Sequence, residues 1–445
     1  MSYIPFSSDE QKEMLQSIEV DSLDQLFSDI PGEIKLNRLL KIAPPLSELE
    51  LINYFNELGE KNESAHKPCF IGAGSYDHYI PSVINHLIMR GEFFTAYTPY
   101  QPEASQGTLQ YIFEFQSMIC ELTGMAAANA SMYDGASAMA EAALMSCRST
   151  GRDKVLISQT VNPQYREVVK TYLNAANLIL EEIPQSHGIT CAESMQKMMD
   201  SSIAGVIVQQ PNFFGVIENY DTFSTTIQNN QSLFIMATNP ISLGRLKTPS
   251  EYNADIVVME GQPLGNAISF GGPYLGILAC RENHIRKMPG RLVGMAEDHN
   301  GNKGFVLTLQ AREQHIRRQK ATSNICSNQS LNALCAVLYL SLLGKQGFVD
   351  LWNLNYQKAH YMASEIDKLE NYSLAFTDKP FFNEFLVKTT KPVEKVRLAL
   401  ENAGLLAGYS PATDYQEYEN CLLFCVTEKR TKNEIDLLVK TLEQV

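Results

Sequence analysis

The middle of the chain alternates short, fully apolar runs with segments of helical spacing. Several times an apolar run typical of a strand is followed by a segment with helical spacing. Residues 163–176 are the clearest of these helical segments. Fully apolar strands separated by helices indicate a mostly parallel sheet covered on both faces. We therefore predict a large α/β domain over residues 66–330. Its expected strands lie at 154–159, 178–183, 204–210, 232–238, 254–260 and 274–280.

The two ends of the chain have different patterns. Residues 1–65 contain helical apolar spacing, with serine and aspartate at positions where helices begin, and they predict an extended helical arm. Residues 331–445 open on a long helical stretch and then alternate strands with helices, which predicts a smaller α+β domain. The expected helices of the arm lie at 7–20, 22–30 and 47–62. In the C-terminal part we expect helices at 327–369, 392–404 and 431–444, and strands at 372–377, 382–389 and 421–427.

Composition and charge narrow the function classes. The chain has 445 residues, 44% of them hydrophobic, and a formal net charge of -14, which argues against a nucleic-acid surface. The most basic stretch, Arg312 to Lys320, has no interleaved aromatic residues, so we favour a solvated helix face or an ion-pair network over RNA binding. No HExxH motif indicates a metal site.

The nine cysteines and the N-terminus suggest a location. The cysteines are scattered and never form a CxxC pair, which is typical of a reducing compartment. No basic flank precedes an apolar run near the start, and no stretch approaches the ~18 uninterrupted apolar residues of a membrane helix. We expect a cytoplasmic protein that does not bind membranes.

A tyrosine-rich loop at 92–110 is the first candidate for chemistry. Two prolines stiffen it, and its phenol and amide groups could orient a small polar ligand without adding charge. The alternative is a loop that packs against a neighbouring subunit, and composition does not decide between the two. The candidate side chains are Tyr97, Tyr100, Gln101, Ser105 and Gln106.

The turn at Asp134 and Gly135 leads into an alanine-rich helix. Such a helix N-terminus binds phosphate in many α/β folds, through backbone N–H groups and the helix dipole. The negative charge of Asp134 opposes phosphate there, and Asp134 could instead be the N-cap. A second glycine turn at 71–79 could bring backbone near a ligand, or it could be an ordinary turn.

Three long segments, 70–144, 259–276 and 307–331, closely resemble the alpha subunits of the glycine decarboxylase P-proteins of the glycine cleavage system. The likeness extends over nearly the whole chain. It implies the fold of type I pyridoxal-phosphate (PLP) enzymes, with a large, mixed, mostly parallel sheet domain and a small α+β C-terminal domain. It also implies an enzyme subunit that takes part in glycine decarboxylation.

The chain departs from what a PLP enzyme of this type needs. The cofactor requires a lysine that binds it covalently and a carboxylate beside its pyridine nitrogen. Asn239 stands where the carboxylate is expected, Gln262 follows the strand where the lysine is expected, and no lysine lies between Lys247 and Lys287. We therefore predict a degenerate cofactor pocket in the large domain and no catalytic residue in this chain alone.

The resemblance implies a division of labour between two unlike chains. A homologous beta subunit would carry the lysine and the PLP in an α2β2 hetero-tetramer, two copies of each chain. The assembled enzyme would decarboxylate glycine and pass the aminomethyl group to the lipoyl arm of H-protein. This chain would complete the site. The residues expected to contact substrate are Tyr76, Tyr97, Tyr100, Gln101, Ser105 and Gln106, and those expected near the cofactor phosphate are Thr322, Ser323 and Asn324.

Two other functions stay open from the sequence. One is an autonomous PLP enzyme that uses an unexpected lysine, with Lys247 and Lys287 as the nearest candidates. The other is a purely structural subunit that binds a partner without touching substrate. For Arg312 and Arg317 we weigh a charge-balancing role toward phosphate or carboxylate against a structural ion pair, and favour the ion pair.

Overall fold

The computed structural model describes residues 6–325 and 327–445, and the chain divides into two compact units. The first reaches Ala65 and the second is His66–Val445. The second unit therefore includes both the predicted α/β segment and the predicted C-terminal segment.

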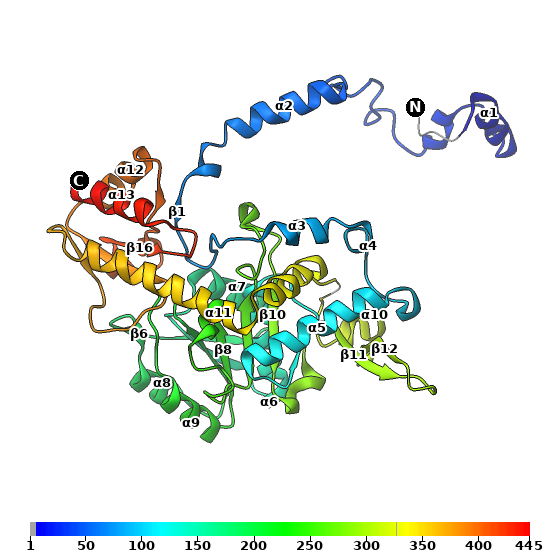
Figure 1. Cartoon of the computed structure of the whole chain (residues 1–445). Coiled ribbons are helices and arrows are strands. Elements are labelled where there is room, and N and C mark those ends of the chain that lie inside the picture. The colour runs from blue at the N-terminus through cyan, green and yellow to red at the C-terminus, as the bar shows by residue number, and fades with distance from the viewer. Residues whose placement is uncertain (1–5, 326) are drawn as a thin grey trace. The chain divides into compact units, whose positions relative to one another are not determined.

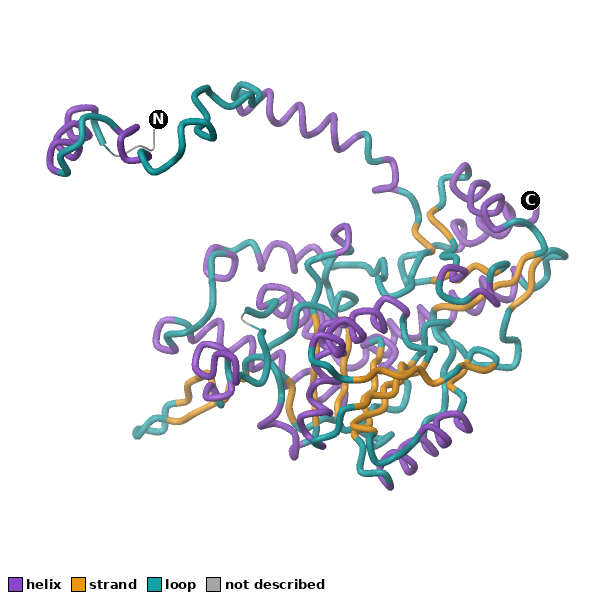
Figure 2. Tube along the Cα trace, turned by 180° about the vertical axis from the view of Figure 1, so that it is seen from behind, coloured by secondary structure: helices purple, strands orange, loops and turns teal. Residues whose placement is uncertain are grey.

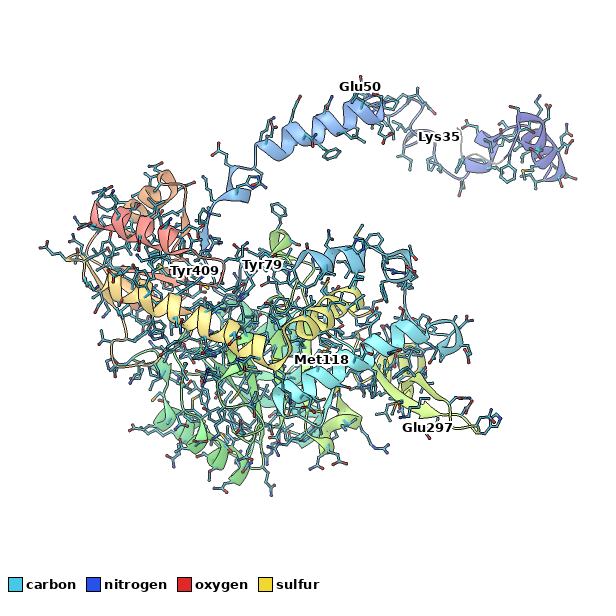
Figure 3. The ribbon with its side chains drawn as sticks, in the orientation of Figure 1. Lys35, Glu50, Tyr79, Met118, Glu297 and Tyr409 are labelled. Carbon is cyan, nitrogen blue, oxygen red and sulfur yellow. The ribbon has the colours of Figure 1, made fainter. Side chains whose placement is uncertain are left out.

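The first unit consists of short helices with no buried residues. Its α-helices are capped as the sequence indicates, because Ser7 and Ser47 each form a capping box with a glutamate three residues later. Glu50, labelled in Figure 3, closes the second box. The segment at 22–30 forms only a 3₁₀ turn in place of the expected helix. The elements are α1 (Ser8–Ser17), η1 (Leu23–Phe27) and α2 (Glu48–Glu60), followed at the boundary by η2 (Glu63–His66).

A seven-stranded sheet organises the second unit, in the order β2-β10-β9-β8-β7-β3-β4. Five neighbouring strands, from β9 to β4, are parallel, and β10 pairs antiparallel with both β9 and β2. Figure 2 shows these strands enclosed by helices. Each apolar run in 154–280 predicted as a strand forms one. The strands are β2 (Ala127–Ala128), β3 (Lys154–Ser158), β4 (Ile179–Ile183), β7 (Ile203–Gln210), β8 (Leu233–Thr238), β9 (Ile256–Glu260) and β10 (Gly276–Cys280).

Helices cover both faces of this sheet, as fully apolar strands require. Within β7, Val206 and Val208 belong to one core cluster and Ile207 to the other, because successive side chains point to opposite faces. The first face is covered by α5 and α11, which cross the sheet in Figure 1, and the second by α6 and α7. The helices are α5 (Gln106–Thr123), α6 (Gly135–Thr150), α7 (Pro163–Ala175), α8 (Ala192–Met198), α9 (Asp221–Asn229) and α11 (Ser330–Ile366).

The C-terminal part packs helices on a small antiparallel sheet of order β13-β14-β16. The second half of α11, α12 and α13 share one apolar cluster with β14 and β16. Its predicted strands and helices all form, with shorter strands than expected. The elements are β13 (Tyr372–Leu374), β14 (Glu384–Thr389), α12 (Val393–Asn402), β15 (Leu406–Ala407), β16 (Cys421–Cys425) and α13 (Lys432–Glu443); β15 pairs in parallel with β1 (Cys69–Phe70).

Helix α11 is the one described helix long and apolar enough to cross a membrane, with a mean hydropathy of 1.4 over its best window. The helix is interrupted at Gly344, whose φ of 57° and ψ of -176° are not helical. Ala333 and Ala336 are fully buried against the sheet, and Met362 is fully buried in the C-terminal cluster. Both halves of the helix thus contribute side chains to the core of the fold.

Several elements were not anticipated from the sequence. The longest is α5, which begins inside the segment 92–110 predicted as a loop, and another is the hairpin of β11 (Leu292–Glu297) and β12 (Lys303–Thr308), which projects from the body in Figures 1 and 2. The remaining elements are short. They are α3 (Ser82–Ile88), α4 (Gly91–Phe94), η3 (Pro102–Ala104), β5 (Gln185–Ser186), β6 (Ile189–Thr190), η4 (Pro240–Gly244), η5 (Ser269–Gly271), η6 (Glu282–Lys287), η7 (Gln310–Arg312), α10 (Gln314–Arg317), η8 (Arg318–Lys320), η9 (Pro411–Thr413) and η10 (Gln416–Tyr418).

Candidate functional site

The carboxyl ends of β8 and β9 meet the N-terminus of α6 at a small cavity of about 40 Å³, here called the strand-end cavity. Ligands of open α/β sheets bind at this edge. An adjoining cavity of about 490 Å³ shares four of its lining residues, Gly74, Asn162, Tyr165 and Glu260. The strand-end cavity is also lined by Tyr76, Gly135, Gln209, Pro211, Ala237, Thr238, Asn239, Pro240, Val258, Met259, Asn383 and Glu384.

Glu260, the last residue of β9, places its carboxylate at the N-terminus of α6, the position called here the anion position of the helix. Its carboxylate accepts hydrogen bonds from the backbone N–H groups of Gly135 (2.9 Å), Gln262 (2.9 Å) and Leu275 (3.1 Å). Gly135 permits this approach, because a Cβ there would lie 3.0 Å from the Cβ of Glu260. A carboxylate of the chain thus occupies the helix N-terminus where a phosphate would otherwise bind.

The pKa of Glu260 reflects this buried position. Burial raises it to about 7, against the lowering effect of the hydrogen bonds from Gly135, Leu275 and Gln262. Asp134 adds a further rise by repulsion. Asp134 itself is the N-cap of α6: its carboxylate accepts from the backbone N–H of Ser137 at 2.7 Å, which decides the question left open by the sequence.

Gln262 uses its amide to fix the neighbouring glycine turn. Its Oε1 accepts from the backbone N–H of Tyr76 at 2.9 Å, and its Nε2 donates to the carbonyl oxygens of Tyr76 (3.0 Å) and Asn266 (2.8 Å). Only 1% of Gln262 is exposed. The residue at the expected lysine position is therefore a buried structural connector.

Neither the expected carboxylate nor a substitute lysine is present at this edge. Asn239 accepts a hydrogen bond from the backbone N–H of Ile241 and caps η4. Lys247 pairs with Asp221, and Lys287 donates to the carbonyl oxygen of Ser149. The lining of both cavities contains no lysine.

PLP does not fit the strand-end cavity. Glu260 holds the position of its phosphate, Gln262 cannot bind its aldehyde, and about 40 Å³ is room for one or two water molecules. Small-molecule sites are usually ~300 Å³ or larger. The strand-end cavity therefore lacks both the room and the chemistry for the cofactor, and the adjoining cavity of about 490 Å³ has the room but no lysine.

Tyr76 and Glu384 close the strand-end cavity from the other side. The Tyr76 hydroxyl donates to Glu384 Oε2 at 2.7 Å, and the backbone N–H of Ala73 donates to Oε1 at 2.6 Å. Burial raises the pKa of Glu384 to about 7 and raises the pKa of Tyr76 well above its ordinary value. Tyr76 is thus the one predicted substrate residue that lines this cavity.

Tyr100 lies instead at a separate cavity of about 460 Å³, here called the tyrosine cavity. The guanidinium of Arg291 lies over the Tyr100 ring, 5.4 Å from its centre, and its Nη2 is 3.4 Å from the hydroxyl. Glu313 is 3.6 Å from Arg291 Nε and 3.5 Å from His315, whose ring packs edge-on against Tyr100. Asn324 also lines this cavity.

The other predicted residues are dispersed. Tyr97 is 78% exposed, and Gln101 and Ser105 lie at the start of η3 and α5. Gln106 exchanges hydrogen bonds with the backbone of Phe305 on β12 and also donates to Pro102, which favours a structural role.

The phosphate candidates are dispersed too. The Ser323 hydroxyl donates to buried Glu141 at 2.7 Å, and Thr322 lines a fourth cavity together with Arg312. Within the described part of the chain, no group of three or more His, Cys, Asp or Glu side chains could hold a metal.

Sequence reasoning missed Glu260 and Arg291. Glu260 ends an apolar strand directly before a glycine, and an acidic residue at that position was the available signal. Arg291 follows a proline and a glycine and gave no signal, since its partner Tyr100 lies 191 positions away.

The family model for the glycine cleavage system P-protein matches residues 1–442. The chain is 52% identical over 446 residues to a probable glycine dehydrogenase (decarboxylating) subunit 1 of Desulfitobacterium hafniense, with 100% of both chains covered. It is 51% identical to the probable subunit 1 of Geobacillus thermodenitrificans, covering 99% of this chain and 98% of that protein.

Solved structures agree. A crystal structure of glycine decarboxylase (P-protein) of the glycine cleavage system, in inhibitor-bound form, matches with a TM-score of 0.91, 42% identity and 100% of both chains covered. A sphingosine-1-phosphate lyase of Burkholderia pseudomallei matches with a TM-score of 0.66 and 13% identity over 92% of each chain. Together with the central sheet, these neighbours confirm the predicted type I PLP-enzyme fold.

Proposed function

Because the chain belongs to the glycine cleavage system P-protein family, we propose that it serves as the subunit of glycine decarboxylase that does not carry the cofactor lysine. The family and its structural neighbours depend on PLP. In this proposal the PLP is bound by a homologous beta-type subunit, two copies of each chain form a hetero-tetramer in the cytoplasm, and the lipoyl arm of H-protein receives the aminomethyl group.

One observation carries the assignment of the cofactor to the partner. The carboxylate of Glu260 accepts the N–H of Gly135 at the start of α6, next to a Gln262 that has no amine. The autonomous-enzyme alternative loses its support here, because Lys247 and Lys287 are engaged elsewhere and line neither the strand-end nor the adjoining cavity.

The tyrosine loop is the part of this chain that we assign to the shared site. PLP supplies an electron sink for loss of carbon dioxide when it is bound. Tyr97 and Tyr100 are 78% and 55% exposed, so their hydroxyls are available to a partner-held ligand. Arg291 holds the Tyr100 ring in place while Glu313 balances its charge, so the Tyr100 hydroxyl is the group offered to a carboxylate such as that of glycine. Gln101 and Ser105 are the neighbouring candidates, and Thr322, Ser323 and Asn324 remain those for the cofactor phosphate.

The test uses the chain purified together with its beta-type partner. Glycine–bicarbonate exchange is measured with PLP, H-protein and either wild-type chain, Tyr97→Ala or Tyr100→Ala. We expect both variants to lower turnover while the assembly keeps its size on gel filtration. Tyr361→Phe is the control, because its hydroxyl bonds to Asp436 on α13, in the C-terminal part.

Two outcomes would contradict the proposal. A wild-type chain that fails to raise exchange above that of the partner alone makes it a structural subunit. A lone chain that retains PLP covalently and decarboxylates glycine makes it an autonomous enzyme.

A further inference from the structure

Four positively charged side chains gather around a cavity of about 300 Å³, here called the basic cavity. This grouping is unexpected in a chain of net charge -14, because like charges that converge on one space repel each other. The volume is at the lower end of small-molecule sites. The cavity is lined by Arg286, Leu309, Ala311, Arg312, Arg317, Lys320 and Thr322.

No carboxylate of the described residues forms a direct ion pair with these cations. Among residues 6–325 and 327–445, none of the four cations has an acidic side chain within ion-pair distance, so the ion pair favoured from the sequence for Arg312 and Arg317 is not formed. Glu313 follows Arg312 in sequence, but its carboxylate faces Arg291 and His315 in the tyrosine cavity. The basic cavity therefore has an excess of positive charge.

Arg312 also has unused hydrogen-bond donors. Its Nη1 donates to the carbonyl oxygen of Met288, which fixes the guanidinium, while Nε and Nη2 are buried without a partner in the described structure. A buried charged donor without an acceptor is costly, and such a group commonly marks the place of an ion or water. Burial lowers the pKa of Arg312, against the attraction of Glu313, and a nearby anion would relieve that effect.

The remaining lining suits a small oxyanion. The backbone N–H of Thr322 bonds to Arg312 O at 3.0 Å, and both residues line the cavity. Arg317 donates Nε to Ala311 O at 3.0 Å, and its two terminal nitrogens have no hydrogen-bond partner among the described residues. Guanidinium groups match phosphate oxygens in pairs, and no aromatic ring is present to stack on a base or sugar.

We propose that the basic cavity binds a phosphate group, held by Arg312, Arg317 and Lys320 with the Thr322 hydroxyl. Four cations match the double negative charge of a phosphomonoester better than the single charge of a carboxylate. The inference rests on the proposed function where the phosphate is that of the partner's cofactor, for which Thr322 is also a candidate. Binding of a free phosphate group does not depend on that function.

Titration of the purified full chain with inorganic phosphate, by calorimetry at constant ionic strength, tests the proposal. We expect saturable binding that equimolar chloride does not reproduce. Arg317→Gln and Lys320→Gln, both exposed side chains, should each weaken affinity about tenfold or more, as expected for loss of a charge-assisted hydrogen bond. Arg312→Gln should weaken it further.

The control variants lie in the same segment and elsewhere on the surface. Arg318→Gln removes an adjacent charge that lines the tyrosine cavity instead, and Lys345→Gln removes an exposed lysine of α11. Both should leave the phosphate affinity unchanged. Circular dichroism establishes that each variant is folded.

A second experiment decides which molecule carries the phosphate group. Phenyl phosphate is titrated against the full chain, and the affinity for PLP is measured in the assembly of the proposed function. If Arg317→Gln weakens PLP binding by the assembly, the phosphate is that of the partner's cofactor. If it weakens only inorganic phosphate and phenyl phosphate, the ligand is a free phosphomonoester. A wild-type chain without phosphate binding above chloride, or an Arg317→Gln variant with wild-type affinity, would overturn the proposal.

Discussion

The carboxylate of Glu260 accepts a 2.9 Å hydrogen bond from the backbone N–H of Gly135, the first residue of α6. Two residues 125 positions apart thus close the end of the helix from within the chain. The helix end needs no external anion, and the absence of a cofactor lysine next to it agrees with this arrangement.

Glu260→Ala should destabilise the fold. Three backbone N–H groups lose their acceptor, and we expect the free energy of unfolding to fall by about 3 kcal/mol. Urea denaturation measures the change. Glu297→Ala, an exposed glutamate at the end of β11, is the matched control and should change the value by less than about 0.5 kcal/mol. Equal stability of the two variants would mean that the Glu260 bonds contribute nothing.

Gln262→Lys should not by itself restore covalent PLP binding. Position 262 is buried and does not line the strand-end cavity, and Glu260 still accepts the first N–H of α6. After incubation with PLP and borohydride reduction, mass spectrometry should find no pyridoxyl group on the peptide containing position 262. A stoichiometric label there would show that Glu260 does not block the cofactor.

The free energy of unfolding should fall as the pH rises through the range in which Glu260 and Glu384 lose their protons. Burial raises the pKa of each from 4.5 to about 7, so the folded chain holds these protons more tightly than the unfolded chain. The stabilisation is fully present below pH 4.5 and is lost as the pH rises through about 7. It amounts to at most about 3 kcal/mol for each group.

Glu384→Gln, which cannot ionise, should reduce this pH dependence. Urea denaturation at about pH 5 and about pH 8 measures the slope in the wild type and the variant. The exposed Glu297→Gln should keep the wild-type slope. An unchanged slope in Glu384→Gln would show that this carboxyl does not titrate in that range.

The opposite pH dependence is expected for Glu428. Burial favours its neutral form, but attraction to His78 and hydrogen bonds from His78 and the backbone of Tyr79 outweigh this and lower the pKa to about 2. Its stabilisation is present above 4.5 and lost as the pH falls through about 2. Glu428→Gln should cost about 2 kcal/mol at neutral pH, and Glu401→Gln, exposed on α12, should cost almost none.

Arg291→Lys should lower turnover of the assembled enzyme about tenfold, because a lysine cannot both lie over the Tyr100 ring and reach its hydroxyl. Combined with Tyr100→Phe, the loss should be smaller than the product of the two single losses, since both changes act on one contact. Arg245→Lys is the control, because its guanidinium makes a surface hydrogen bond to Asn353. Glycine–bicarbonate exchange measures the turnover of the two single variants, the double variant and the control. If the two single losses multiply in the double variant, Arg291 and Tyr100 act independently.

The sequence predicted the local features of this fold and missed those that depend on distant residues. Apolar runs located the strands of the central sheet from β3 to β10, and the Asp134 turn indicated the start of α6. The sequence did not predict that the Glu260 carboxylate would accept the first N–H of α6. Glu260 comes close to this helix only when β9 joins the sheet. Tyr76 and Glu384 are 308 positions apart, and no spacing rule connects them. The loss of the cofactor lysine, by contrast, is a matter of residue type and was visible in the sequence.

An intramolecular carboxylate at the head of α6 has a thermodynamic consequence. A protein that needs its vitamin-derived ligand to complete a helix gains stability in proportion to the logarithm of that ligand's concentration. Glu260 is present at a fixed, effectively saturating local concentration, so α6 of this chain is complete as soon as β9 is in place. Its melting temperature should therefore be insensitive to the vitamin B6 status of the cell.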